Sequence, residues 1–328
     1  MKTEIILYNR QAGGIFMNKT RVIFFGTPEF ARRILNTLIE ENYEVVAAVS
    51  QPDRPVGRKH IIQPTPVHEL CIEHNILCLQ PEKLSTIKDE IAQLEPNLIL
   101  TCAYGQFIPQ SILDIPTQGS LNIHPSLLPR YRGGAPIQHA VMNGDKETGV
   151  CLMQVVKAMD AGDIYACYHT HIGEEETFSM LNERLMNISE QLVREQLPKY
   201  LSGELEGIPQ DESKLVLGYN ITKEEEQVHF QTENGKQIYN HIRGLIDWPI
   251  AYGMIDGNRI KFYRVSFEEK ETNEPCGKIL GFDKQAMLVA VQGGILKVYS
   301  LQMQGKKQMD AIAFANGVGR ELIGKVFD

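Results

Sequence analysis

Two polar side chains that could take part in catalysis, Asn122 and His124, lie two residues apart at the end of the apolar run 119–124. Because side chains alternate between the faces of a β-strand, both should point the same way. An asparagine amide can donate a hydrogen bond to an oxyanion, and an imidazole can move a proton or stabilise negative charge. The alternative, which spacing alone favours, is that both side chains only satisfy backbone groups of the next loop.

A third candidate group lies in the stretch MDAGDI, where Asp160 and Asp163 flank an Ala-Gly pair between two apolar runs. Acidic residues around such a pair usually mark only a turn. A carboxylate beside His124 would orient the imidazole and favour its protonated form. Asp160 is far from His124 along the chain, so spacing cannot establish this contact.

The elements that would position these groups alternate between strand and helix. Apolar runs at 21–26, 44–50, 76–79, 96–105 and 119–124 are separated by helical patterns, the first with Thr27 as its expected N-cap. This alternation predicts an α/β fold with a Rossmann-like, doubly wound, mostly parallel sheet. Such sheets bind ligands at the carboxyl ends of their strands, where Asn122 and His124 stand. A helix with an apolar stripe, at 176–201, should close the domain.

The first strand-to-helix turn, FFGTPEF, contains a single glycine. A dinucleotide-binding turn needs the G-x-G-x-x-G glycines for close approach to a pyrophosphate, and a P-loop needs G-K-[ST]. The turn therefore argues against a nicotinamide-dependent oxidoreductase and against a P-loop enzyme.

The pattern changes after residue 201, where Gly, Pro and charged residues dominate. Short alternating runs then predict a small, OB-like β-barrel. We expect an N-terminal extension at 1–16 that is non-native or belongs to an upstream start, a catalytic domain at 17–205, a linker at 206–225 and the barrel at 226–328. The last part has 13 Lys and Arg against 12 Asp and Glu, whereas the whole chain has a net charge of −8, so the barrel repels a polyanion least.

Composition excludes several classes of protein. Apolar residues make up 43% of the chain and charged residues 23%, which is typical of a folded protein, and no apolar run is long enough to span a membrane. The six cysteines form no C-x-x-C pair and are expected to be reduced thiols in a cytoplasmic protein. No histidine spacing indicates a metal site. The single tryptophan, Trp248, is expected to be a packing anchor.

Five stretches, in order, resemble the methionyl-tRNA formyltransferases, which belong to the folate-dependent formyltransferase superfamily. They are RVIFFGTPEFA, SQPDRPVGR, LNIHPSLLPRYRGGAPI, ETGVCLMQ and MDAGDI, and the resemblance extends from Met17 to Asp328. It implies transfer of a formyl group from 10-formyltetrahydrofolate to the α-amino group of methionyl-initiator-tRNA, without a metal. Asn122, His124 and Asp160 would be the catalytic residues. The alternatives are a formyltransferase for a nucleotide-linked amino sugar and a non-catalytic RNA-binding module on the same scaffold.

The resemblance also implies where the two substrates bind. The folate pocket would be walled by Tyr104, Gly105, Gln106, Ser126, Leu127, Leu128 and Pro129. The basic insertion at 50–60 would meet the tRNA acceptor stem through Arg54, Arg58 and Lys59. Candidate tRNA contacts on the barrel are Arg243, Arg259, Lys261, Arg264, Lys306 and Lys307. No membrane or obligate protein partner is expected, and the protein should be a monomer.

Overall fold

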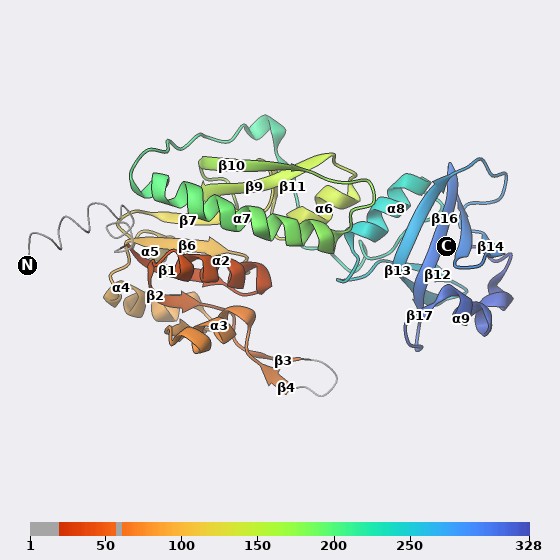
Figure 1. Cartoon of the computed structure of the whole chain (residues 1–328), viewed down its shortest axis with the longest axis horizontal. Helices are drawn as coiled ribbons and strands as arrows, with labels where there is room; N and C mark the ends of the chain where they lie inside the picture. Colours follow the sequence, from red (N-terminus) through yellow and green to blue (C-terminus); the bar gives the residue numbers. More distant parts are fainter. Residues whose placement is uncertain (1–19, 57–60) are drawn as a thin grey trace, which may run out of the picture. The chain divides into compact units, whose positions relative to one another are not determined.

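The computed structural model describes residues 20–56 and 61–328 of the chain. These residues form two compact units (Figure 1). The first holds the chain up to Gly134 together with Gly149–His169 and Arg184–Leu217, and the second holds Ala135–Thr148, Thr170–Glu183 and Gly218–Asp328. The expected extension at 1–16 lies outside the described residues, and the domain boundaries expected from the sequence stay a prediction.

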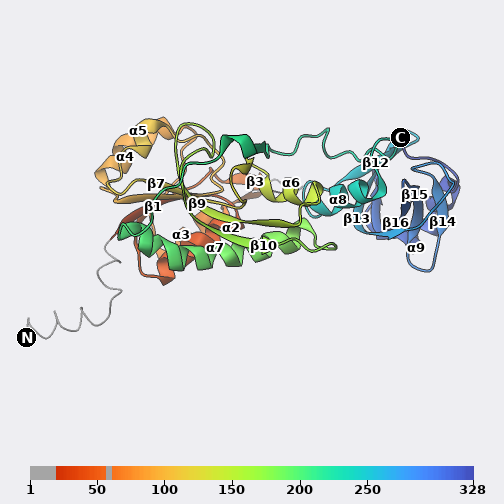
Figure 2. The ribbon, with the colours of Figure 1, turned by 90° about the horizontal axis from the view of Figure 1, so that it is seen from above.

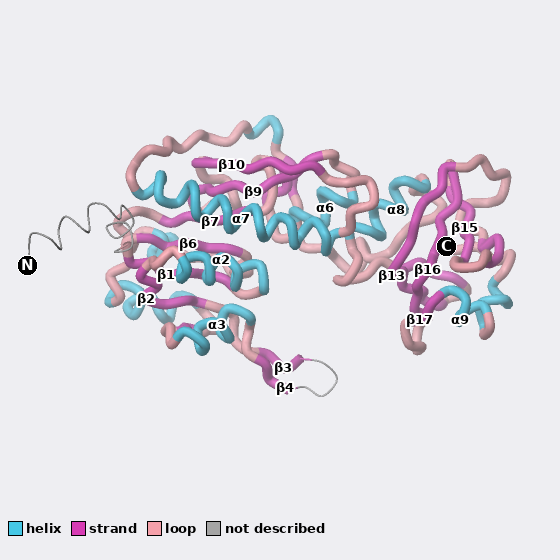
Figure 3. Tube along the Cα trace, viewed as in Figure 1, coloured by secondary structure: helices cyan, strands magenta, loops and turns pink. Residues whose placement is uncertain are grey.

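The first unit is built on a seven-stranded sheet with the order β10-β9-β7-β6-β1-β2-β5 (Figure 3). β1 pairs in parallel with β2 and β6, β2 with β5, and β6 with β7, whereas β9 runs antiparallel to β7. The Rossmann-like, mostly parallel sheet is therefore confirmed, with its switch of strand order between β1 and β6. The strands are β1 (Arg21–Gly26), β2 (Glu44–Val49), β5 (Cys78–Leu79), β6 (Leu98–Cys102), β7 (Ser120–His124), β9 (Glu147–Gln154) and β10 (Ile164–His171).

Helices cover both faces of this sheet, which explains why its central strands are continuously apolar. Figure 2 shows α4 and α5 on one side of the sheet and α2, α3 and α7 on the other. Ile23 and Phe25 of β1 pack with Ile91 of α4 and Ile112 of α5. The helices of the described residues are α2 (Glu29–Glu40), α3 (Pro66–His74), α4 (Lys88–Gln93), α5 (Gln110–Leu113), α6 (Pro136–Met142), α7 (Phe178–Leu201), α8 (Gly235–Gly244) and α9 (Ala311–Ala315), with 3-10 turns η2 (Leu84–Ile87), η3 (Glu212–Lys214) and η4 (Val318–Leu322).

Helix α2 begins one residue later than an N-cap at Thr27 would place it. α2 starts at Glu29 with Pro28 as its N-cap, and no side chain caps it. The Thr27 hydroxyl donates instead to the carbonyl oxygen of Tyr104, 3.1 Å away. The prediction of Thr27 as N-cap is wrong because this hydroxyl joins the β1–α2 turn to the loop after β6.

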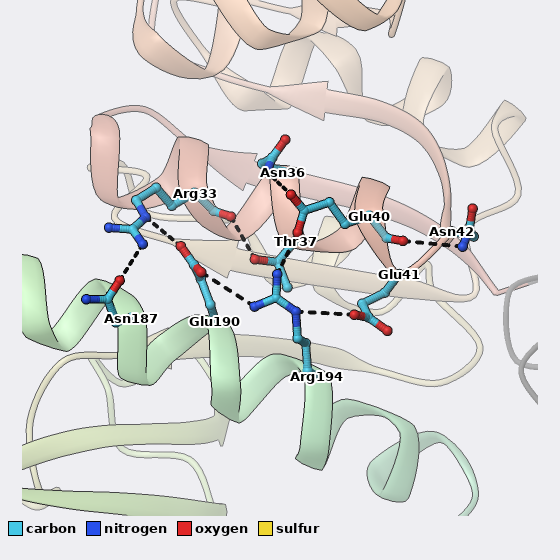
Figure 4. Close-up of polar contacts among 9 residues, drawn as sticks. All are labelled: Arg33, Asn36, Thr37, Glu40, Glu41, Asn42, Asn187, Glu190 and Arg194. Carbon is cyan, nitrogen blue, oxygen red and sulfur yellow. Dashed lines mark hydrogen bonds and ion pairs between the residues drawn. The ribbon is translucent and has the colours of Figure 1, made fainter.

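The long helix α7 is fastened to α2 by charged side chains (Figure 4). Arg33 contacts Glu190 at 2.5 Å, and Arg194 contacts Glu40 at 2.5 Å and Glu41 at 3.2 Å. The predicted apolar stripe of this helix is buried, with Leu181, Leu185 and Leu192 fully inaccessible. The ion pairs themselves add little stability, since partly exposed pairs contribute at most about 1 kcal/mol each.

The second unit contains an antiparallel half-barrel sheet with the order β12-β13-β16-β15-β14, on which β17 pairs with β16. Its core includes Phe230, which stacks on Phe327 at 4.8 Å and meets Phe262 edge-on at 6.2 Å. This unit confirms the small C-terminal barrel fold. Its strands are β12 (Tyr252–Ile255), β13 (Asn258–Glu269), β14 (Ile279–Phe282), β15 (Met287–Val291), β16 (Gly294–Met303) and β17 (Met309–Asp310).

Two expectations about single residues are wrong. Cys151 and Cys167 form a disulfide between β9 and β10, because sheet pairing brings these sequence-distant residues together. Trp248 is 64% exposed and is not a buried anchor. No helix in the described part of the chain is long and apolar enough to cross a membrane.

Candidate active site

Asn122 lies near the carboxyl end of β7, beside Thr101 of β6 in the strand register. The Thr101 hydroxyl donates to Asn122 Oδ1 at 2.7 Å, and Thr101 is only 6% exposed. With its oxygen occupied by this bond, the Asn122 amide directs its Nδ2 hydrogens away from Thr101. Asn122 is therefore held as a donor at the edge where this sheet type binds ligands.

His124, the last residue of β7, is 3% exposed and is held from both sides of its ring. Its Nε2 lies 3.0 Å from the carbonyl oxygen of Tyr131, and because a carbonyl can only accept, Nε2 carries a proton. Its Nδ1 lies 3.8 Å from Asp160 Oδ2. The loop-backbone contact and the carboxylate contact are therefore both present, on opposite nitrogens. A proton on Nδ1 would face the carboxylate.

Asp160 reaches this position through a turn between β9 and β10. Its φ of +47° lies in the left-handed region, which L residues rarely adopt. Its Oδ2 accepts a hydrogen bond from the Gly133 backbone N–H at 2.9 Å. Gly133, with φ +132°, follows the short strand β8 (Arg130–Arg132), so this loop contacts both His124 and Asp160.

The segment expected to wall a folate pocket after β7 uses its side chains mainly for internal packing. Ser126 is fully buried, and its hydroxyl donates to the Arg130 carbonyl oxygen at 2.7 Å. Leu128 packs with Cys151 and Met153. Among these residues Leu127 is partly exposed and Pro129 is buried.

The loop after β6 contains a buried polar atom without a partner. Tyr104 is 5% exposed, its ring meets Phe25 edge-on at 5.3 Å, and its hydroxyl has no hydrogen-bond partner among the described residues. Burial raises the pKa of Tyr104 to about 12, so the phenol stays protonated and can donate. Gly105 follows with a φ of +87°, and Gln106 donates to Gln51 Oε1 at 2.9 Å. The buried phenol thus has a hydrogen-bond donor that no described residue accepts.

In the described part of the insertion, β3 (Arg54–Val56) pairs antiparallel with β4 (Ile61–Gln63), which follows the insertion. Arg54 is exposed and pairs with Glu82 at 3.0 Å. Arg58 and Lys59 lie outside the described residues. Asp53, just before β3, is partly buried, and this burial raises its pKa. Hydrogen bonds from Gln80, His68 and the Thr65 N–H lower the pKa by more than burial raises it, so the net shift is downward.

The predicted tRNA contacts of the second unit differ in exposure. Arg243 is 3% exposed, and its guanidinium donates to the carbonyl oxygens of Gly173 and Glu176 and to Asn240. The prediction of Arg243 as a tRNA contact is therefore wrong, because this side chain is buried and its donors are taken by acceptors of the chain itself. Lys306 and Lys307 are exposed in the turn after β16. Beside that turn is a hollow of about 410 Å³ lined by Arg259, Lys261, Gln302, Met303, Gln304 and Gly305.

Sequence reasoning missed the residues that hold the catalytic candidates in place. Thr101 looks like an ordinary strand residue, and Gly133 acts through its backbone. Arg132 is nearly buried, although arginines are usually at the surface. No sequence signal identifies these contacts, since each depends on a partner from another element. Within the described ranges 20–56 and 61–328, no group of three or more His, Cys, Asp or Glu side chains could hold a metal ion.

Comparison with known proteins identifies the family. Residues 19–197 match the pattern described as Formyl transferase, and residues 220–319 match Formyl transferase, C-terminal domain. The chain belongs to the formyl transferase family. Within it, the chain is 44% identical to Methionyl-tRNA formyltransferase of Malacoplasma penetrans over 93% of its length and 95% of that protein. It is 41% identical to Methionyl-tRNA formyltransferase of Enterococcus faecalis, over 93% of this chain and 98% of that protein.

Solved structures share the fold at low sequence identity. HypX from Aquifex aeolicus, solved in complex with tetrahydrofolic acid, is 17% identical with a TM-score of 0.65, covering 92% of this chain and 48% of that one. An N-formyltransferase from Helicobacter canadensis, in complex with folinic acid and dTDP-3-aminofucose, is 15% identical with a TM-score of 0.64, covering 85% and 98%. At this identity the likeness concerns the fold.

Proposed function

We propose that the protein transfers the formyl group of 10-formyltetrahydrofolate to the α-amino group of methionyl-initiator-tRNA, the reaction that prepares this tRNA for translation initiation. The observation that carries the proposal is the identity of 44% to a methionyl-tRNA formyltransferase over 93% of the chain. The same fold occurs in an N-formyltransferase solved with dTDP-3-aminofucose, so the fold alone does not identify the acceptor, and the identity to methionyl-tRNA formyltransferases favours tRNA. A monomeric, cytoplasmic protein is part of the proposal.

The three candidate catalytic residues take complementary roles. The α-amino group of an amino acid has an ordinary pKa of about 7.7–8.0, so much of it is unprotonated near neutrality. Asn122 Nδ2 donates to the negative charge that develops on the formyl oxygen. His124 holds a proton at Nδ1 and delivers it to the departing nitrogen. Asp160, whose Oδ2 lies 3.8 Å from His124 Nδ1, orients the imidazole ring and accepts the amine proton through water.

The folate co-substrate supplies an activated formyl carbon. The proposal assigns its binding to the loops 102–107 and 126–129, at the carboxyl ends of β6 and β7. The unpartnered Tyr104 hydroxyl supports this assignment, since a buried donor without a partner lowers stability by roughly 1–3 kcal/mol unless a ligand satisfies it. Leu127, the partly exposed apolar side chain of the second loop, would contact the ligand's apolar surface.

We propose that exposed basic side chains contact the tRNA. Lys306 and Lys307, beside the hollow that Arg259 and Lys261 line, form a basic surface on the half-barrel. Arg54, Arg58 and Lys59 of the insertion are the proposed acceptor-stem contacts. Such contacts release counterions from the phosphate backbone, so tRNA affinity should fall steeply as salt increases.

The test supplies 10-formyltetrahydrofolate with charged initiator tRNA, with a nucleotide-linked amino sugar, or with neither. Formyl-methionine should appear only with the tRNA. A formylated sugar, or no product in any incubation, would overturn the proposal. Asn122→Ala should lower turnover by about 10²–10³, and His124→Ala by about 10²–10⁴. Normal turnover in either variant would refute that residue's role while leaving the overall reaction standing.

A further inference from the structure

The segment 207–217, which lies within the linker expected at 206–225, is bonded to the turn that carries Asp160 and to the strand after it. Ile208 exchanges two backbone hydrogen bonds of 2.9 Å with Ile164, the first residue of β10. Farther along, β11 (Val216–Leu217) pairs in parallel with β8. We call residues 207–217 the strap. It lies wholly within the first unit.

Gln210 is the point at which the strap meets the Asp160 turn. Its Nε2 donates to the carbonyl oxygens of Asp160 and Gly162, both at 2.8 Å. Its Oε1 accepts from Arg132 Nε at 3.0 Å and from Arg132 Nη2 at 2.8 Å. A primary amide has two donor hydrogens and two acceptor lone pairs, so these four bonds use its full capacity. Glutamate would keep the acceptors and lose both donors.

Arg132 connects Gln210 to the loop that holds His124. The guanidinium is nearly buried and also contacts Glu212 of the strap at 2.7 Å. The residues on either side of Arg132 are the ones that contact the catalytic candidates, since Tyr131 accepts from His124 and Gly133 donates to Asp160. Gln210 therefore completes a cycle of contacts that includes His124 and Asp160.

The backbone of Asp160 needs such support. Its φ of +47° is disfavoured for a residue with a Cβ, and such conformations persist only where the surroundings hold them. The Gly133 N–H holds the carboxylate and the Gln210 amide holds the carbonyl. Without the second contact the turn can relax and move the carboxylate away from His124 Nδ1.

We propose that Gln210 is a positioning residue for formyl transfer, and that the strap is part of the catalytic apparatus rather than a passive connection. This inference rests on the proposed role of Asp160 in the reaction. Gln210 contacts no residue that we assign to folate or tRNA binding, so its loss acts on the chemical step and leaves substrate affinity unchanged.

The first test measures kcat and KM for both substrates in Gln210→Ala and Gln210→Glu. Both variants lose the two hydrogen bonds from Gln210 to the Asp160 turn, each a factor of about 2–13 in an equilibrium. Gln210→Ala also loses the two bonds from Arg132. We expect kcat to fall by about tenfold in Gln210→Glu and at least as much in Gln210→Ala, with KM unchanged. Asp211→Asn is the matched control, because Asp211 is exposed and its carboxylate contacts only Ser213 and Lys214, within its own turn. It should keep kcat within about twofold. Should Gln210→Ala fail to fold, the glutamate variant, which retains the acceptors for Arg132, carries the test.

A double-mutant cycle with Asp160→Asn tests the role of Gln210 separately from the role of Asp160. If Gln210 acts through the Asp160 carboxylate, Gln210→Ala should lower kcat in the native background and have no further effect in the Asp160→Asn background. An equal loss in both backgrounds, or unchanged kcat in Gln210→Ala beside an impaired Asp160→Asn enzyme, would overturn the role of Gln210 alone. Normal turnover in Asp160→Asn would instead overturn the role of Asp160.

Discussion

Replacing Thr101 with valine isolates the orientation of the Asn122 amide from its presence. The two side chains have nearly the same shape, and valine suits a buried strand, so the sheet should keep its geometry. The change removes only the hydroxyl that donates to Asn122 Oδ1 at 2.7 Å. Asn122 keeps its amide but loses the contact that directs Nδ2 toward the proposed position of the formyl oxygen.

The size of the effect follows from this single hydrogen bond. A net value of about 1 kcal/mol corresponds to roughly a fivefold change, since about 1.4 kcal/mol is tenfold. The upper limit is the loss of one oxyanion donor, about 10²–10³. We therefore expect Thr101→Val to lower kcat by about five- to tenfold. The activity that remains should be well above that of Asn122→Ala.

The assay is the initial rate of formyl-methionyl-tRNA formation at saturating concentrations of both substrates. Thr101→Ser restores the hydroxyl and should return kcat to within about twofold of the native value. In an Asn122→Ala background, Thr101→Val should have no further effect on kcat. Native kcat in the valine variant, or equal losses in the serine and valine variants, would refute the view that this hydroxyl orients the amide.

Three further predictions concern the buried phenol of Tyr104, the acid dependence of stability at Asp53, and the disulfide between Cys151 and Cys167. Tyr104→Phe should raise the free energy of unfolding by about 1 kcal/mol, because it removes a buried hydroxyl without a partner, and should raise KM for the formyl donor; lower stability in chemical denaturation would show that the phenol has a partner. The lowered pKa of Asp53 contributes stability that is present above the carboxyl's unfolded value of about 3.9 and is lost as pH falls toward the folded value. Unfolding of Asp53→Asn should therefore be less acid-dependent, and an unchanged pH slope would count against stabilisation of this carboxylate by Gln80, His68 and the Thr65 N–H. Reducing the disulfide, or replacing Cys167 with serine, should lower the free energy of unfolding by about 3 kcal/mol, as expected for a loop of this length; equal denaturation midpoints with and without reductant would contradict this.

The fold could be predicted because its signals are local. Continuous apolar runs with intervening helical patterns indicate a sheet covered on both faces, and the stripe containing Leu181 and Leu185 indicates the helix that packs on it. The exceptions involve contacts from elsewhere. Thr27 has the residue type of an N-cap, but its hydroxyl bonds to the Tyr104 carbonyl oxygen of another loop. Cys151 and Cys167 pair only because their strands are neighbours.

The candidate site was only partly predictable for the same reason. Residue type and position at a strand end identified Asn122 and His124, and resemblance identified Asp160. Arg243 was misjudged because charge alone does not reveal burial, and here the carbonyl oxygens of Gly173 and Glu176 accept from its buried guanidinium. Gln210 lies in a stretch whose composition is typical of a linker, so its four contacts could not be anticipated.

The amino-acid sequence by itself determined which chemical groups the protein has and the order in which strands and helices present them. Apolar periodicity acts over a few residues, and it is sufficient to place an amide and an imidazole on one face of one strand. The tertiary structure alone decided the distance of 3.8 Å between His124 Nδ1 and Asp160 Oδ2. That distance depends on a left-handed turn, a buried arginine and an amide from a distant segment, and such contacts are fixed by packing and mutual hydrogen-bond satisfaction rather than by local preference.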